Sequence, residues 1–190
     1  MDGQHGGGRR IVVGVSGTLG SLTALHRAVA EAARTEAAGT PAEVLAVLAW
    51  LPQGGEHGYR LAPCPPLLQH WREVAVARLT EALEAAFGGP SGDHGPGVLR
   101  PGGVRLTAEA VRGDAGEVLV RTADRPGDLL VVGVGGGLLR RGLRPSVAGY
   151  CVRRAGCPVL AVPRPALQYD LAELHRRSRR HLLPAPAAHR

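Results

Sequence analysis

The sequence predicts an α/β fold, with a five-stranded parallel sheet and helices on both faces, of the Rossmann-like kind. Short apolar runs and amphipathic stretches alternate in the order βαβαβαβαβ, which is typical of a parallel sheet with right-handed crossovers. Of the 190 residues, 44% are hydrophobic but only 3% are aromatic, so Val, Leu and Ala must build the core, as in a buried parallel sheet. This length suits one domain with tails.

The first half of the chain predicts two strands and two helices. A β-branched run at 11–15 predicts a buried strand that stops at Gly17. Ser21 is expected to cap the next helix, where apolar residues recur at helical spacing up to Gly39. The expected core residues of that helix are Leu22, Leu25, Val29 and Ala32. The remaining expected elements are a strand at 44–50, a Pro/Gly-rich loop at 51–66 and an amphipathic helix at 67–87, with Leu68, Trp71, Ala75, Leu79, Leu83 and Phe87 on its apolar face.

The second half predicts three further strands. Residues 88–103 are rich in Gly and Pro and are expected to form a flexible linker. Asp114 followed by Glu117 resembles a capping box and predicts a helix start. The expected elements are strands at 104–111, 129–132 and 158–162, and helices at 114–123 and 146–155. The expected organisation is a disordered start at 1–8, a domain at 9–165 and a basic tail at 166–190, in which 171–183 could form a helix.

Composition limits the possible functions. The net charge is +7, and every basic residue other than His is Arg, which excludes Schiff-base or P-loop lysine chemistry. We attribute the arginines to GC-rich codon usage in preference to polyanion binding. Three cysteines without a C-x-x-C pair, and the lack of a secretory apolar segment, predict a cytoplasmic protein. No apolar run reaches the roughly 20 residues of a membrane span, so no membrane association is expected.

A glycine-rich turn predicts an anion site. The apolar strand at 129–132 opens into Gly133-Val134-Gly135-Gly136-Gly137, and a helix follows at Ser146. Glycines let backbone N–H groups approach a ligand, and a helix N-terminus adds unpaired donors. From Leu129 to Tyr169 there are six arginines and no Asp or Glu. Since ligands bind at the carboxyl ends of parallel strands, we expect the turns 16–21 and 133–146 to meet across one crevice.

Three segments resemble the universal stress protein family: Arg10 to Val15 followed by Gly17, Leu130 to Gly133, and Ser146 to Leu160 (SVAGYCVRRAGCPVL). The resemblance runs from about Arg9 to Pro165. It implies an adenine nucleotide alpha hydrolase-like fold and a cytoplasmic, non-catalytic dimer of the stress response. The fifth strand, Val159 to Val162, is expected to join the dimer.

One branch of the family binds ATP through a motif of the form G-x2-G-x9-G-[S/T], and the resemblance implies a related site here. Gly133 and Gly136 match the first two glycines and Ser146 matches the final Ser/Thr, although the spacing is one residue shorter than in the motif. Pro145 replaces the third glycine, and Ser16 replaces an Asp that contacts the nucleoside. We therefore expect weakened ATP binding, with Mg²⁺ only alongside ATP and no metal site of the protein itself. The predicted nucleotide contacts are Val15, Ser16, Gly17, Thr18, Val47, Gly133, Gly135, Gly136, Arg144, Ser146 and Val147.

Simpler roles remain open for these residues. The glycines could be only a flexible strand exit, Ser146 only a helix cap and Thr18 only a turn residue, which for Thr18 is slightly favoured. Cys151 and Cys157 are expected to be buried apolar groups. His57, His70 and His94 lack metal spacing, and the basic run 175–181 lacks the interleaved aromatics that nucleic-acid binding favours.

Two other functions remain open. Residues 16–21 (SGTLGS) are similar to the S-G-G-x-D-S loop of PP-loop ATP pyrophosphatases, but Thr18 and Gly20 depart from it and no lysine is present. The function of an ATP-using enzyme is therefore the least favoured alternative, and no catalytic residue is predicted. The other function is a ligand-free dimeric interaction module.

Overall fold

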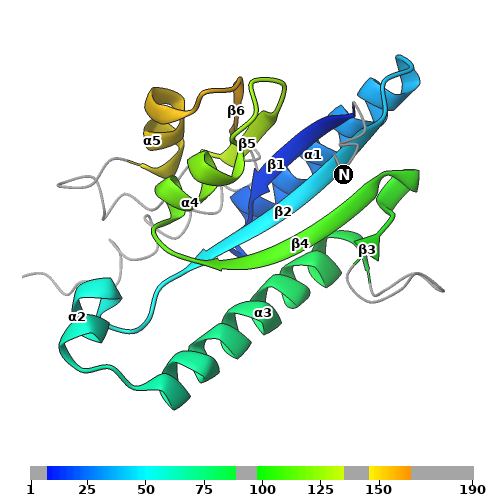
Figure 1. Ribbon diagram of the computed structural model, residues 1–190. Coiled ribbons are helices and arrows are strands. Elements are labelled where there is room, and N and C mark those ends of the chain that lie inside the picture. The colour runs from blue at the N-terminus through cyan, green and yellow to red at the C-terminus, as the bar shows by residue number, and fades with distance from the viewer. Residues whose placement is uncertain (1–7, 89–97, 135–145, 164–190) are drawn as a thin grey trace, which may run out of the picture.

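The predicted parallel sheet is confirmed in the computed structural model, which describes residues 8–88, 98–134 and 146–163 (Figure 1). The parallel strands are β1 (Arg9–Gly14), β2 (Ala42–Trp50), β4 (Arg105–Arg112), β5 (Leu129–Gly133) and β6 (Val159–Val162). They lie in the order β4-β2-β1-β5-β6. The sheet therefore extends in both directions from β1, which is its central strand.

The expected flexible linker is partly wrong. The short strand β3 (Val98–Leu99) pairs antiparallel with β4 at the sheet edge, and a 3-10 turn, η1 (Pro101–Gly103), follows it. The Gly- and Pro-rich composition of this segment does not predict a strand. The edge strand forms because its backbone pairs with β4. Residues 89–97 lie outside the described residues, as do the tail 166–190, with its suggested helix at 171–183, and most of the N-terminal segment.

Helices cover both faces of the sheet. Helices α1 (Leu19–Ala37) and α3 (Pro65–Phe87) pack on one face, and α4 (Ala115–Thr122) and α5 (Val147–Arg154) pack on the other. A seven-residue helix, α2 (Gly55–Leu61), occupies part of the expected 51–66 loop, which corrects that prediction. Gly55 and Gly58 within α2 oppose helix formation, so contacts of α2 with Arg112 outweigh propensity. Among the described helices, none is both long and apolar enough to cross a membrane.

Two of the three expected helix caps are confirmed. Asp114 caps α4 by accepting a hydrogen bond from the Gly116 N–H, and Ser146 caps α5 by accepting one from the Gly149 N–H. The prediction for α1 was wrong, because Thr18 is the N-cap and Ser21 is the third helical residue. Thr18 and Ser21 form a reciprocal capping box, so the serine supports the cap that the threonine provides.

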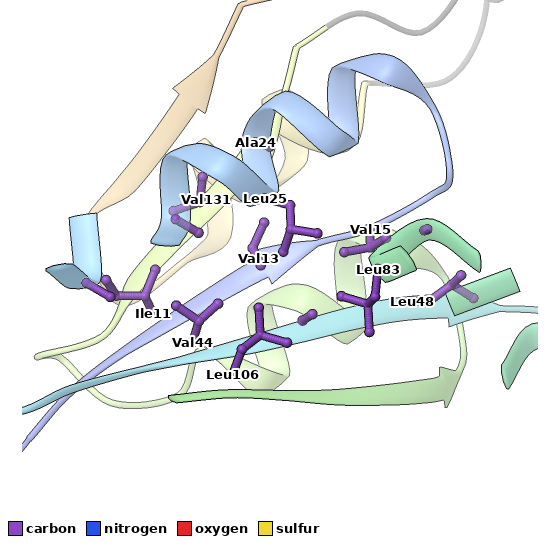
Figure 2. Close-up of a cluster of buried hydrophobic side chains, with 14 of the residues drawn as sticks. Ile11, Val13, Val15, Ala24, Leu25, Val44, Leu48, Leu83, Leu106 and Val131 are labelled. Atoms are coloured by element: carbon purple, nitrogen blue, oxygen red, sulfur yellow. The ribbon is translucent and has the colours of Figure 1, made fainter. Parts of the chain in front are cut away.

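The core lies on both sides of the central strand. Ile11 and Val13 pack with Leu25 toward α1 and α3, whereas Val12 packs with Leu119 toward α4 (Figure 2 shows the first cluster). All three β1 residues are fully buried, and each buried side chain of this size contributes about 1.5–3 kcal/mol. Of the expected helical core residues, Leu25, Ala32, Ala75, Leu79 and Leu83 are buried, while Leu22, Val29, Leu68, Trp71 and Phe87 are only partly buried.

The cysteines on the α5 side fit the expected apolar role to different degrees. Cys151 is fully buried in the cluster with Val12 and Leu119, and Cys157 is partly buried beside it. Burial raises the pKa of the Cys151 thiol to about 11. The group therefore stays neutral through the physiological range, as a small apolar side chain would.

A buried ion pair ties the start of β1 to the start of β5. The Arg10 guanidinium donates to both carboxylate oxygens of Asp128, at 3.2 and 2.7 Å, and to the Thr122 carbonyl at 2.8 Å. Asp128 is only 1% exposed, and it also accepts a hydrogen bond from the Arg125 N–H at 3.2 Å. The hydrogen bond to Asp128 raises the pKa of Arg10, with Asp124 contributing further. The pair thus fixes the α4–β5 connection against the central strand.

We predict that Asp128→Ala lowers the free energy of unfolding by about 2–4 kcal/mol. The substitution leaves the partly buried Arg10 guanidinium and the Arg125 N–H without their carboxylate acceptor. Chemical denaturation monitored by circular dichroism measures this loss. The matched control is Asp124→Ala, which removes the other carboxylate that Arg10 contacts. Its side chain is 66% exposed, so the loss should be clearly smaller. Equal losses in both variants would contradict the structural role assigned to the buried carboxylate.

Candidate functional site

The strand order reverses between β1 and β5. From β1 the chain passes through α1 to β2 on one side, and from β5 it passes through α5 to β6 on the other. Ligand crevices of open α/β sheets lie at such a point, outside the carboxyl ends of the strands. Because β1 and β5 are paired neighbours, with Val13 opposite Val131, their carboxyl ends reach this edge together.

The end of β5 lies directly against the start of α1. A Cβ placed on Gly133 would be 2.6 Å from the Gly20 carbonyl oxygen and 3.4 Å from the Ser21 nitrogen. No larger residue fits that gap without moving the backbone. Close packing against α1 therefore explains the glycine at position 133, in addition to any flexibility at the end of the strand. The expected convergence of the two turns is thus observed for their described parts. The contact does not by itself assign Gly133 to a ligand.

The turn between β1 and α1 is held by the hydroxyl of Ser21. This oxygen accepts hydrogen bonds from the N–H groups of Ser16 (3.2 Å) and Thr18 (3.1 Å), and it donates to the Thr18 carbonyl (2.8 Å). Gly17 between them has φ +73°, a conformation that favours glycine. Two of the turn's N–H groups are therefore already used within the protein. Sequence reasoning missed this role of Ser21, although its spacing from Ser16 and Thr18 was visible.

What the turn offers to a ligand is a pair of hydroxyl groups. The side-chain oxygens of Ser16 and Thr18 lie 3.1 Å apart, and both residues are exposed. Each hydroxyl can donate one hydrogen bond and accept others. Thr18 also caps α1, as the simpler interpretation of this residue requires. The two roles are compatible, because the cap occupies only one of the lone pairs of the oxygen.

The first turn of α5 lies at the same edge of the sheet. Since α5 connects the parallel strands β5 and β6, it begins at their carboxyl ends. The Ser146 hydroxyl accepts the Gly149 N–H at 3.1 Å, and no acidic residue occupies the first turn of α5. Val134 and Val147 are each 40% exposed, which leaves apolar surface next to these polar groups.

Of the three predicted valine contacts, Val147 is exposed, whereas Val15 and Val47 are buried. Val15 is 4% exposed and Val47 is 1% exposed, and the Val15 N–H donates to the Val47 carbonyl at 2.8 Å. They lie beneath the turn and hold β1 to β2. Gly135, Gly136 and Arg144 lie outside the described residues. Their contacts with a ligand, like those of the valines, stay predictions.

Titratable groups are sparse among the described residues of this edge. Residues 15–18, 133–134 and 146–147 include no Asp, Glu, His, Lys or Arg. In the described part of the chain no three His, Cys, Asp or Glu residues gather as a metal site would need. The described edge can therefore bind through hydroxyls, backbone donors and apolar contact.

We predict that Gly133→Ala lowers stability by about 1–3 kcal/mol, because its methyl group would overlap the Gly20 carbonyl. Gly156→Ala is the matched control, since a Cβ at that position meets no atom within 4 Å. Thermal and urea unfolding of both variants measure the difference. A Gly133→Ala variant as stable as the control would show that β5 and α1 do not approach each other this closely.

Comparisons with known proteins agree with this fold. The model of the "Universal stress protein family" matches residues 8–163. The structure of a universal stress protein in complex with cAMP is similar, with 26% identity, TM-score 0.55, and coverage of 84% of this chain and 100% of that chain. The structure of hypothetical protein MJ0577 is also similar in fold, with 18% identity, TM-score 0.59, and coverage of 83% and 96%. No curated protein sequence matches. The chain belongs to the universal stress protein family.

Proposed function

We propose that the crevice between the β1–α1 turn and the first turn of α5 binds an adenine nucleotide, and that the protein is a non-catalytic, cytoplasmic member of the stress response. The observation that carries the proposal is the close approach of Gly133, at the end of β5, to Gly20, at the start of α1, which brings the carboxyl end of β5 against the β1–α1 turn. The cAMP complex of the 26% identical family member supports an adenine nucleotide as the ligand class.

Charge at the end of β1 should determine affinity. Ser16 offers a neutral hydroxyl where the nucleotide-binding branch of the family has a carboxylate. A hydrogen bond to a charged group contributes about 1.5–3 kcal/mol, compared with roughly 1 kcal/mol for a neutral one. We therefore propose nucleotide binding that is weak relative to that branch. Mg²⁺ would enter only with the phosphates of ATP.

The absence of catalysis is part of the same proposal. The chain has no lysine, and the turn 16–21 has Gly20 where the related ATP pyrophosphatases carry an acidic residue. The described part of the crevice has no residue able to act as a general base near neutral pH. We propose that a bound nucleotide dissociates from the protein chemically unchanged.

We predict that ATP, ADP, AMP or cAMP raises the melting temperature, and that Ser16→Asp tightens binding of the preferred nucleotide by about 2- to 30-fold. Ser146→Asp should abolish binding, because Asp still caps α5 but repels phosphate. Ser146→Thr is the control that keeps a hydroxyl at the cap. Differential scanning fluorimetry and calorimetry measure both effects.

Chromatography of the recovered nucleotide completes this experiment. Intact nucleotide is the expected result, and steady release of pyrophosphate would favour the ATP-using enzyme. No shift with any of the four nucleotides at millimolar concentration, with Mg²⁺ present, would contradict the nucleotide proposal and favour the interaction module.

We also propose a homodimer joined through β6. The carbonyls of Pro158 and Val162 accept hydrogen bonds from β5, so the alternate residues, Val159 and Ala161, direct their backbone groups away from it. Strand β6 is the edge of the described sheet, and an uncovered strand edge readily pairs with another chain. A strand of a second chain that pairs with this edge would leave the parallel pairing of β6 with β5 unchanged.

Light scattering should give twice the 19.8 kDa mass of the chain at micromolar concentration. Ala161→Pro should shift the mass toward the monomer, because it removes the outward N–H while leaving the β5 pairing intact. Ala161→Val, which keeps the N–H, is the control. A wild-type monomer would contradict the proposal.

A further inference from the structure

A pocket of about 340 Å³ lies at the carboxyl ends of β2 and β4, on the face that α3 covers. Trp50, Ala110 and Arg112 line it from the strands, and Pro65, Leu68 and Arg72 line it from α3. The volume is within the range of small-molecule sites, which starts at about 300 Å³. None of these residues belongs to the candidate nucleotide crevice, so the pocket is a separate feature of the fold.

The charged lining of the pocket is entirely basic. Arg112 is fixed in place, because it donates to both Glu56 carboxylate oxygens (2.7 and 2.8 Å) and lies 4.7 Å from the centre of the Tyr59 ring. Glu56 neutralises it. Arg72 forms no ion pair within the part of the chain that the structure describes, and no carboxylate lines the pocket. The charge of Arg72 is therefore available to an anion.

The indole of Trp50 adds an unsatisfied donor. Its Nε1 atom is buried, and no acceptor for its hydrogen exists among the described residues. A buried N–H without a partner costs free energy, because it has lost water and gained nothing. Since the ring itself lines the pocket, the contact proposed below requires the side chain to rotate until this N–H faces an oxygen of the bound molecule.

The rest of the lining defines the body of the ligand. Pro65, Leu68 and Ala110 are apolar, and the Trp50 ring adds an aromatic wall. The fourth polar group, Gln69, donates its amide hydrogen to Glu73 at 2.9 Å, so it is engaged along α3. A suitable occupant has two acceptor oxygens at one end and an apolar or aromatic body at the other.

We propose that this pocket binds a small organic monocarboxylate with an apolar or aromatic body. Its carboxylate pairs with Arg72 and accepts the Trp50 N–H, and its body packs on the indole ring, Leu68 and Pro65. The pairing satisfies a donor and a cation that lack partners within the described structure. Phosphate meets only the charge requirement, because it has no apolar body to pack against the apolar walls of the pocket.

Phenylacetate is the probe, and tryptophan fluorescence is the readout. The protein has two tryptophans, so Trp71→Phe leaves Trp50 as the only source of tryptophan fluorescence. Phenylacetate should produce a saturable change in emission, whereas 2-phenylethanol, the neutral analogue, and inorganic phosphate should not. Arg72→Gln should weaken phenylacetate binding at least tenfold. Arg78→Gln, which removes a charge from α3 outside the pocket, is the matched control and should bind normally.

A second variant keeps the test valid if Arg72→Gln folds poorly. Trp50→Phe keeps an aromatic wall and removes the orphan N–H, so it should be at least as stable as wild type but bind phenylacetate more weakly in calorimetry. No saturable response to phenylacetate up to tens of millimolar would overturn the proposal. So would an equal response to 2-phenylethanol or phosphate, or unchanged affinity in a folded Arg72→Gln variant.

Discussion

The pairing of β1 with β5 is the constraint on which the candidate crevice depends. At the amino ends of these strands, Arg10 and Asp128 form a buried ion pair, and at the carboxyl ends, Gly133 meets the Gly20 backbone. Between the two contacts, β1 is buried on both faces by side chains from all four packing helices and the sheet. The position of the β1–α1 turn relative to the end of β5 is thus set by packed groups at both ends of one strand pair.

The internal hydrogen bonds of the turn limit what it can recognise. In a glycine-rich phosphate loop, successive N–H groups point at the ligand. Here the Ser21 hydroxyl has already accepted two of these N–H groups, from Ser16 and Thr18. These two N–H groups are therefore not available to a ligand, so the turn offers fewer backbone donors than such a loop and relies more on its side-chain hydroxyls.

Sequence patterns predicted the elements whose stability is local or periodic. The strands, the amphipathic faces of α1 and α3, and the caps Asp114 and Ser146 follow from alternation, helical spacing and capping chemistry. Apart from the cap of α1, the misses depend on contacts between distant residues. Helix α2 exists despite its glycines because Glu56 and Tyr59 meet Arg112, far along the chain. Strand β3 needs β4, and the pocket beside Trp50 needs α3 to lie over the ends of β2 and β4. For the site, the meeting of the two turns could be predicted from topology, and the role of Ser21 was missed although its spacing from Ser16 and Thr18 was a signal for it.

The two sites on this sheet should select anions by different physical means. The described part of the crevice has no fixed charge, so it favours a ligand with many hydrogen-bonding groups, such as a nucleotide. The Trp50 pocket has one arginine neutralised by Glu56 and another without a described acidic partner, beside apolar walls. Arg112 lowers the pKa of Glu56, so this neutralisation is complete above the ordinary pKa of 4.5 and fails only as the pH falls through the lowered value. At neutral pH the pocket therefore has the net charge of Arg72 alone, which matches one carboxylate better than a multiply charged phosphate chain.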